Sequence, residues 1–118
     1  MIHQKSRKKL NLSSKHRKAF IRNQALHFIK YGKLKSTLAG IKEVRRLVEK
    51  LVTIARGGND FNRRRHAYKL LPYDKKALES LFKDIAPKYV DRPGGYTRIH
   101  RLSQRISDTA KIGQLSWV

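Results

Sequence analysis

The stretch that decides the fold is "STLAGIKEVRRLVEKLVTIARGG", residues 36–58 of a 118-residue chain. Its apolar residues recur at intervals of three and four, which predicts an amphipathic helix with one buried stripe. Ser36 or Thr37 can cap the start of this helix, and Gly57-Gly58 is a typical end. The buried stripe is expected to contain Leu38, Ile41, Val44, Val48, Leu51, Val52 and Ala55. The residues expected to face away are Lys42, Glu43, Arg46, Glu49 and Lys50.

Upstream of this helix, the pattern predicts one more helix and a short strand. Ser13 and Ser14 are good N-caps for a helix that runs from residue 15 to residue 31. Gly32 is expected to end it, and residues 33–37 read as a strand. Residues 1–12 have no useful apolar period, so we expect an extended basic tail (1–12) leading into a single globular domain (13–118).

Downstream, two further helices are expected. Asn59 or Asp60 can cap a third helix that reaches about Leu71. Asp74 can cap a fourth, which should end before Pro87 because proline lacks the backbone N–H that a helix interior needs.

After Gly95 the pattern changes to that of a β-hairpin. Residues 96–102 and 112–118 are predicted strands, with a turn around Ser107-Asp108. The predicted fold class is therefore α+β: four helices packed with a small mixed β-sheet, formed by the short strand and the C-terminal hairpin.

The charge balance indicates a polyanionic partner. Lys and Arg number 29 against 8 Asp and Glu, which gives a formal net charge of +21 and a pI near 11.0. Residues 1–42 hold 12 of the basic residues and no acid. So much like charge on a small chain is tolerable when a polyanion neutralises it, and nucleic acid is the first candidate, with an anionic membrane second.

Several function classes are excluded or disfavoured. The chain has no cysteine, and its five histidines form no metal-binding motif, so no metal or other cofactor is expected. No set of residues has catalytic spacing, so we expect no enzyme. No apolar run is long enough to span a bilayer and no secretory signal is visible, which favours a soluble cytoplasmic protein.

Two stretches carry the strongest nucleic-acid signals. "NRRRH" (62–66) places three arginines over about 200° of helix surface, so at least one must point outward. In "DRPGGYTRIHRL" (91–102), the two glycines can take positive φ or admit a close neighbour. Tyr96, Arg98, His100 and Leu102 would then share one strand face, and its Tyr, Arg and His side chains suit RNA. The alternatives are a solvated helical face, and a hairpin with a buried tyrosine and solvated arginines.

Five segments resemble one protein family in order and spacing. They are "SRKKLN", "SSKHRKAFIRNQA", "YGKLKSTLAGIKEVRRLVEKLVTIAR", "NRRR" and "LFKDIAPKYVDRPGGYTRI". The chain is similar over nearly its whole length to bacterial-type large-subunit ribosomal proteins of the L-seventeen family. The resemblance implies a mixed α/β fold with a small sheet, bound to large-subunit rRNA near the exit of the peptide tunnel, on a bacterial or organellar ribosome. The implied partners are large-subunit rRNA and neighbouring ribosomal proteins at the tunnel exit, with no membrane and no homo-oligomer.

The resemblance also implies rRNA contacts, position by position. These are His3, Lys5, Lys8, Lys9, Asn11, Arg17, Arg22, Asn23, Asn62, Arg63, Arg64, Arg92, Gly94, Gly95, Tyr96 and Arg98. We add Lys15, Lys33, Lys35, Arg65, Arg101 and Arg105 as predicted rRNA contacts. The chain departs from the family pattern at Ile2, Gln4, Leu12 and Ile106, where the family usually has arginine, and at Arg7, Ser103 and Ser107, where it usually has glycine.

The predicted function is a structural, rRNA-binding constituent of the large ribosomal subunit. A free-standing nucleic-acid-binding regulator is the alternative, but no helix-turn-helix signature is visible. A membrane-active protein is third, because the polar face of the helix over residues 38–55 reads as mixed in charge rather than cationic.

Overall fold

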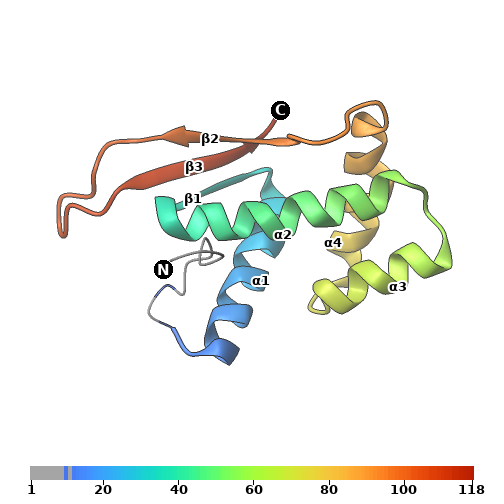
Figure 1. Cartoon of the computed structure of the whole chain (residues 1–118), viewed down its shortest axis with the longest axis horizontal. Helices are drawn as coiled ribbons and strands as arrows, with labels where there is room; N and C mark the ends of the chain where they lie inside the picture. The colour runs from blue at the N-terminus through green and yellow to red at the C-terminus, as the bar shows by residue number, and fades with distance from the viewer. Residues whose placement is uncertain (1–9, 11) are drawn as a thin grey trace, which may run out of the picture.

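The computed structural model describes residue 10 and residues 12–118, so nearly all of the predicted tail lies outside the described residues. The elements of the described part follow the predicted order (Figure 1). They are α1 (Ser14–Tyr31), β1 (Lys33–Thr37), α2 (Leu38–Arg56), α3 (Phe61–Leu70), α4 (Lys75–Ser80), η1 (Leu81–Ile85), η2 (Ala86–Tyr89), β2 (Thr97–Arg101) and β3 (Ile112–Trp117). The α+β class with four helices and a small sheet is confirmed.

Helix α2 is the centre of the domain. It packs against α1, α3 and all three strands, and the sheet lies along one side of it (Figure 1). The predicted stripe is buried except for Leu38, which is half-buried, and Ile41, Val48 and Leu51 have no exposed surface. Burying a side chain of this kind stabilises the fold by roughly 1.5–3 kcal/mol, so this one stripe holds the layers together.

Helix ends lie where capping chemistry predicts them. Ser13, Thr37, Asp60 and Asp74 each accept a hydrogen bond from a backbone N–H in the first turn of the following helix. Gly32 ends α1 in the left-handed conformation, with φ +77°. The side-chain oxygens of the four N-cap residues accept from N–H groups that have no acceptor within the helix.

The fourth α-helix ends before Pro87, as predicted, but it is shorter than predicted and stops at Ser80. The chain continues through the π-helix η1 into the 3₁₀ helix η2, which contains Pro87 in its first turn. Proline is tolerated there because an N–H in a first helical turn has no partner to lose.

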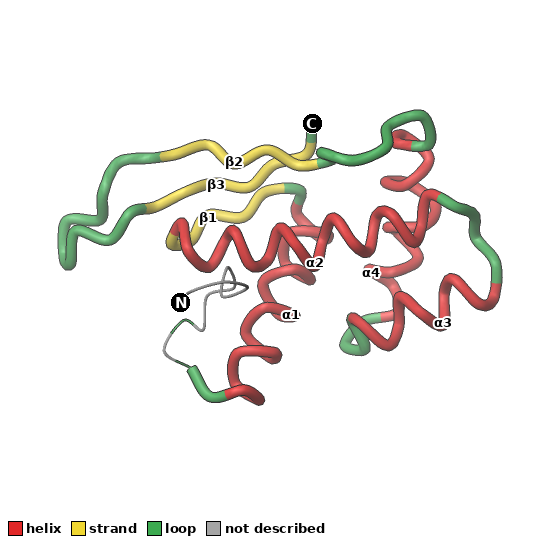
Figure 2. Tube along the Cα trace, viewed as in Figure 1, coloured by secondary structure: helices red, strands yellow, loops and turns green. Residues whose placement is uncertain are grey.

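The sheet is antiparallel throughout, with strand order β1-β3-β2 (Figure 2), rather than mixed as predicted. Leu34, Leu115 and Ile99 are paired across the three strands, and their side chains face α2. The hairpin dictates the direction of β2 against β3. The direction of β1 relative to β3 depends on pairing between segments far apart in the sequence, which local patterns do not determine.

Candidate nucleic-acid interface

The outward side of α2 is more cationic than its sequence indicates. Lys42, Arg46 and Lys50 are exposed and lie four residues apart, so they form one row along the helix. Glu43 and Glu49 were expected to share this face; the expectation is wrong for Glu43, whereas Glu49 lies on the polar side of α2 but is largely covered. Glu43 is only 5% exposed and the Glu49 side chain 22% exposed. Both glutamates line cavities beside the row, but they are far less exposed than its three cations.

Glu49 holds the segment that precedes β2. Its carboxylate accepts hydrogen bonds from the backbone N–H of Tyr96 (3.1 Å), the backbone N–H of Thr97 (3.2 Å) and the Thr97 hydroxyl (2.9 Å). The Nε of Arg45 lies 3.7 Å from the same carboxylate. These contacts turn the carboxylate away from solvent and fix the start of β2 against α2.

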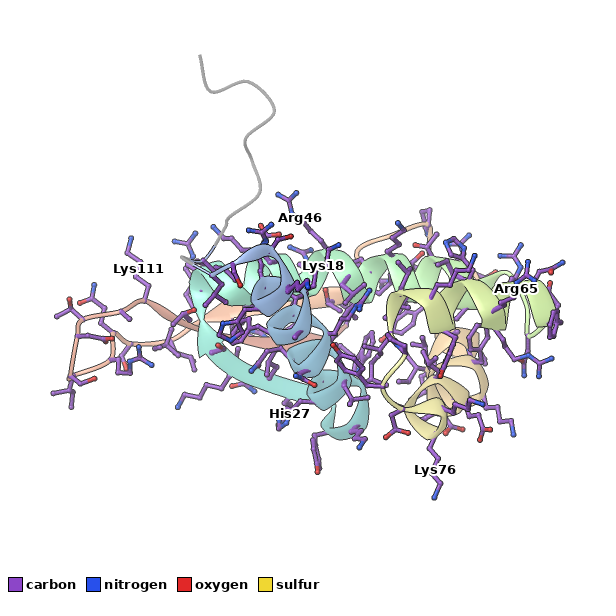
Figure 3. The ribbon with its side chains drawn as sticks, turned by 90° about the horizontal axis from the view of Figure 1, so that it is seen from below. Lys18, His27, Arg46, Arg65, Lys76 and Lys111 are labelled. Atoms are coloured by element: carbon purple, nitrogen blue, oxygen red, sulfur yellow. The ribbon has the colours of Figure 1, made fainter. Side chains whose placement is uncertain are left out.

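Helix α1 adds two cations to this surface. Lys18 and Arg22 line a cavity of about 220 Å³ together with Arg46 and Lys50 of α2. Lys18 and Arg46 lie together at one edge of the molecule, whereas His27 and Lys76 lie at the opposite edge (Figure 3). We refer to Lys18, Arg22, Lys42, Arg46 and Lys50 as the α2 face.

A second cleft opens between α2 and the glycine pair. It encloses about 590 Å³ and is lined by Lys42, Arg46 and Lys50 on one side and by Gly94 and Gly95 on the other. Gly95 has φ +63°, a left-handed conformation that side chains disfavour, so it is required by the turn. Gly94 needs no positive φ, and a Cβ there would meet no atom within 4 Å.

Tyr96 does not offer a stacking surface, contrary to the expectation that it shares an exposed strand face with Arg98. The residue is 1% exposed, its ring centroid lies 5.4 Å from that of Tyr89, and its hydroxyl accepts a hydrogen bond from Arg56 (3.2 Å). Strand β2 begins at Thr97, so the alternation that would place Tyr96 beside Arg98 does not extend back to it. For this residue the alternative of a buried tyrosine holds.

The outer face of the sheet gathers four of the exposed basic or histidine side chains. Lys33 and Arg98 flank Ser116, and Lys35 and His100 flank Gln114, in two rows across the strands. Cross-strand neighbours on one face lie about 4.5–5.5 Å apart. We refer to Lys33, Lys35, Arg98 and His100 as the sheet face; it points away from α2.

The three arginines of α3 have different roles. Arg63 donates to the carbonyl of Ile54 at 3.1 Å and pairs with Asp60 at 3.5 Å. It packs so closely on Gly57 that a Cβ there would lie 2.1 Å from its Nη1. The Arg63 guanidinium therefore donates to a carbonyl in the last turn of α2, and this contact leaves it less free to bind rRNA as predicted. The other predicted contacts of α3, Asn62, Arg64 and Arg65, are exposed.

At the hairpin tip, Arg105 is paired rather than free. Its Nε and Nη2 donate to the two carboxylate oxygens of Asp108 at 3.0 and 2.8 Å. This pairing, with a further hydrogen bond from the N–H of Ala110, lowers the pKa of Asp108 to about 2. Ile106, where the family pattern has arginine, is fully exposed at the predicted turn.

The structure therefore groups some predicted contacts and separates others. Arg22 belongs to the α2 face and the glycine pair adjoins it, and Lys33, Lys35 and Arg98 belong to the sheet face. The residues of α3 and the hairpin tip lie at opposite ends of the molecule (Figure 1). Of the other predicted contacts, Lys15, Asn23, Arg92 and Arg101 are exposed and Arg17 is half-buried. His3, Lys5, Lys8, Lys9 and Asn11 lie outside the described residues.

The predicted contact set missed four residues that the structure brings together: Lys18, Lys42, Arg46 and Lys50. Their helical spacing was visible in the sequence, but the neighbouring glutamates concealed the cationic face. The polar face of α2 therefore counts less strongly against a membrane-active protein than expected, because Glu43 is buried and Glu49 is only partly exposed. Within residue 10 and residues 12–118, no helix is both long and apolar enough to cross a bilayer, and no group of three metal-ligating side chains occurs.

Comparison with known proteins gives one consistent family. A family model described as Ribosomal protein L17 matches residues 20–118. A protein of Helicobacter acinonychis named large ribosomal subunit protein bL17 is 42% identical over 118 residues, which is 100% of both chains. The protein of that name from Syntrophotalea carbinolica is 42% identical over 110 residues (93% of this chain and 70% of that protein). The one from Clostridium kluyveri is 40% identical over 105 residues (89% and 91%).

Proposed function

The chain belongs to the ribosomal protein L17 family and is a structural, non-enzymatic constituent of the large ribosomal subunit, and we propose that it binds large-subunit rRNA through the α2 face and the sheet face. The observation that carries the proposal is the α2 face. Five cations gather there, while Glu43 is almost fully buried and the Glu49 carboxylate accepts hydrogen bonds from the backbone N–H groups of Tyr96 and Thr97.

Phosphate neutralisation is the mechanism. Each lysine or arginine that contacts a phosphate releases a condensed counterion, and this release drives association. The sheet face points to the side away from α2, so the two faces engage different RNA segments. A protein of net charge +21 thereby holds together segments that would otherwise repel.

Gly94 gives the RNA backbone room to approach the α2 face. It lines the cleft beside Lys42, Arg46 and Lys50, and neither its conformation nor a neighbour explains the lack of a side chain. The resemblance of the motifs around Gly94 to the family supports a position near the exit of the peptide tunnel, next to other large-subunit proteins.

Binding to in vitro-transcribed large-subunit rRNA, measured as a function of salt with excess small-subunit rRNA as competitor, tests the proposal. With on the order of ten phosphate contacts, the logarithm of affinity falls with the logarithm of salt concentration with a slope of about −7 to −9. Replacing Arg46 and Lys50 by Gln should make the slope shallower by about 1.5 to 2. The matched control replaces Lys76 and Lys88 by Gln, which removes the same charge from exposed positions outside both faces.

A wild-type slope near −2 would mean that most basic residues are not engaged, and rRNA binding of this kind would be refuted. Equal effects of the two double variants would show that net charge acts without a defined α2 face. A free-standing regulator would also fail to sediment with large subunits after a high-salt wash, whereas a ribosomal constituent remains with them.

A further inference from the structure

A groove between α3 and α4 lies at the end of the molecule opposite the hairpin tip (Figure 1) and encloses about 410 Å³. Leu78 and Phe82, both almost fully buried, line its inner part. Phe61 and Tyr68 are seven residues apart on α3 and therefore share one side of that helix. They line the groove while remaining 66% and 40% exposed, respectively. The groove thus presents two aromatic rings to solvent.

Positive charge surrounds these rings. The guanidinium carbon of Arg65 lies 5.8 Å from the ring centroid of Phe61, and the Nζ of Lys75 lies 5.6 Å from that of Tyr68. Arg64 and Lys83 also line the groove. Within the described part of the chain, none of the four cations that line the groove forms an ion pair, whereas Arg63 of α3 pairs with Asp60.

We propose that this groove binds an unpaired nucleotide of large-subunit rRNA, with the base on the aromatic rings and its phosphates against the basic rim. The inference rests on the proposed function and adds a site for a base to its phosphate-binding faces. Aromatic and guanidinium planes accept any base by stacking, and the adjacent cations attract the backbone.

The charge of the rim favours RNA over a segment of a neighbouring protein. An apolar side chain would fill the inner part of the groove but leave all four cations without counter-charge. Glu79 is the one acidic residue among those that line the groove in the described structure. A nucleotide satisfies both the aromatic rings and the cations.

The discriminating variant replaces Phe61 and Tyr68 by Leu, which keeps the groove apolar and removes the rings. The control is Tyr31→Leu, a 71% exposed aromatic residue of α1 outside the groove. Affinity for in vitro-transcribed large-subunit rRNA, with small-subunit rRNA as competitor, should fall roughly tenfold or more for the double variant and stay unchanged for the control. The salt slope of the double variant should remain that of the wild type, because no phosphate contact is lost.

Melting temperatures verify that both variants fold, which the exposure of the replaced rings favours. If the double variant and Tyr31→Leu bind large-subunit rRNA equally well while the wild-type salt slope is steep, the groove inference is overturned and the proposed function stays intact. Unchanged rRNA affinity combined with reduced incorporation into large subunits would identify a protein as the occupant, and that result also overturns the proposal. A shallow wild-type slope would instead refute the proposed function.

Discussion

Replacing Glu49 by Ala should destabilise the free protein strongly, although the residue lies on the polar side of α2. The carboxylate accepts from the backbone N–H groups of Tyr96 and Thr97, which are 1% and 3% exposed. Each buried donor left without an acceptor costs about 1–3 kcal/mol. Because the Glu49 side chain is 22% exposed, water can enter the space it leaves, and we expect a total of about 2–4 kcal/mol.

For a chain of 118 residues, 1 kcal/mol corresponds to about 4 °C in Tm. Glu49→Ala should therefore lower the Tm by about 8–16 °C in a circular dichroism melt. Glu49→Gln keeps one acceptor and should lose about half as much. The matched control is Glu79→Ala, an exposed helical position at which we expect a change within about 0.5 kcal/mol.

Amide hydrogen exchange gives a direct reading of the same contacts. The N–H groups of Tyr96 and Thr97 should exchange faster in Glu49→Ala than in wild type, by more than the change in global stability predicts. If Glu49→Ala and Glu79→Ala melt within 2 °C of each other, a shift of about 0.5 kcal/mol, the hydrogen bonds of Glu49 do not hold this segment. The Glu49 carboxylate would then be free to reach solvent, and the polar side of α2 would be mixed in charge.

Three further outcomes are expected. Gly95→Ala should cost roughly 1–2 kcal/mol in urea unfolding because of its positive φ, and Gly94→Ala less than about 0.5; equal costs would contradict the distinct roles given to the two glycines. An NMR titration should give Asp108 a pKa of about 2, and Arg105→Gln should raise this pKa; an ordinary pKa in the wild type would disprove the pairing. Because the folded-state pKa is lowered, the ordering of the hairpin tip by this carboxylate is complete above the ordinary pKa of Asp and is lost as pH falls through about 2. Leu51→Ala should cost about 2–5 kcal/mol by leaving a cavity in the core, and a loss below 1 kcal/mol would show that α2 is not its centre.

Local chemistry was enough to predict the elements of this protein. The apolar stripe of α2, the caps at Ser13 and Asp74 and the left-handed Gly32 involve residues within one or two helical turns of each other. Such patterns are visible in any linear reading of the chain. The net charge of +21 likewise indicated a polyanionic partner before any fold was known.

Tertiary structure alone decided which charged groups reach solvent. Glu49 has the sequence context of an exposed residue, but its carboxylate accepts hydrogen bonds from backbone N–H groups 47 and 48 residues further along the chain. Tyr96 has the spacing of a strand residue, but the strand begins one residue later and the ring enters the core. Both outcomes depend on contacts between distant segments, which burial and hydrogen-bond satisfaction select only when the chain has folded. The cationic faces are therefore a property of the packed molecule, although every residue that forms them is present in the sequence.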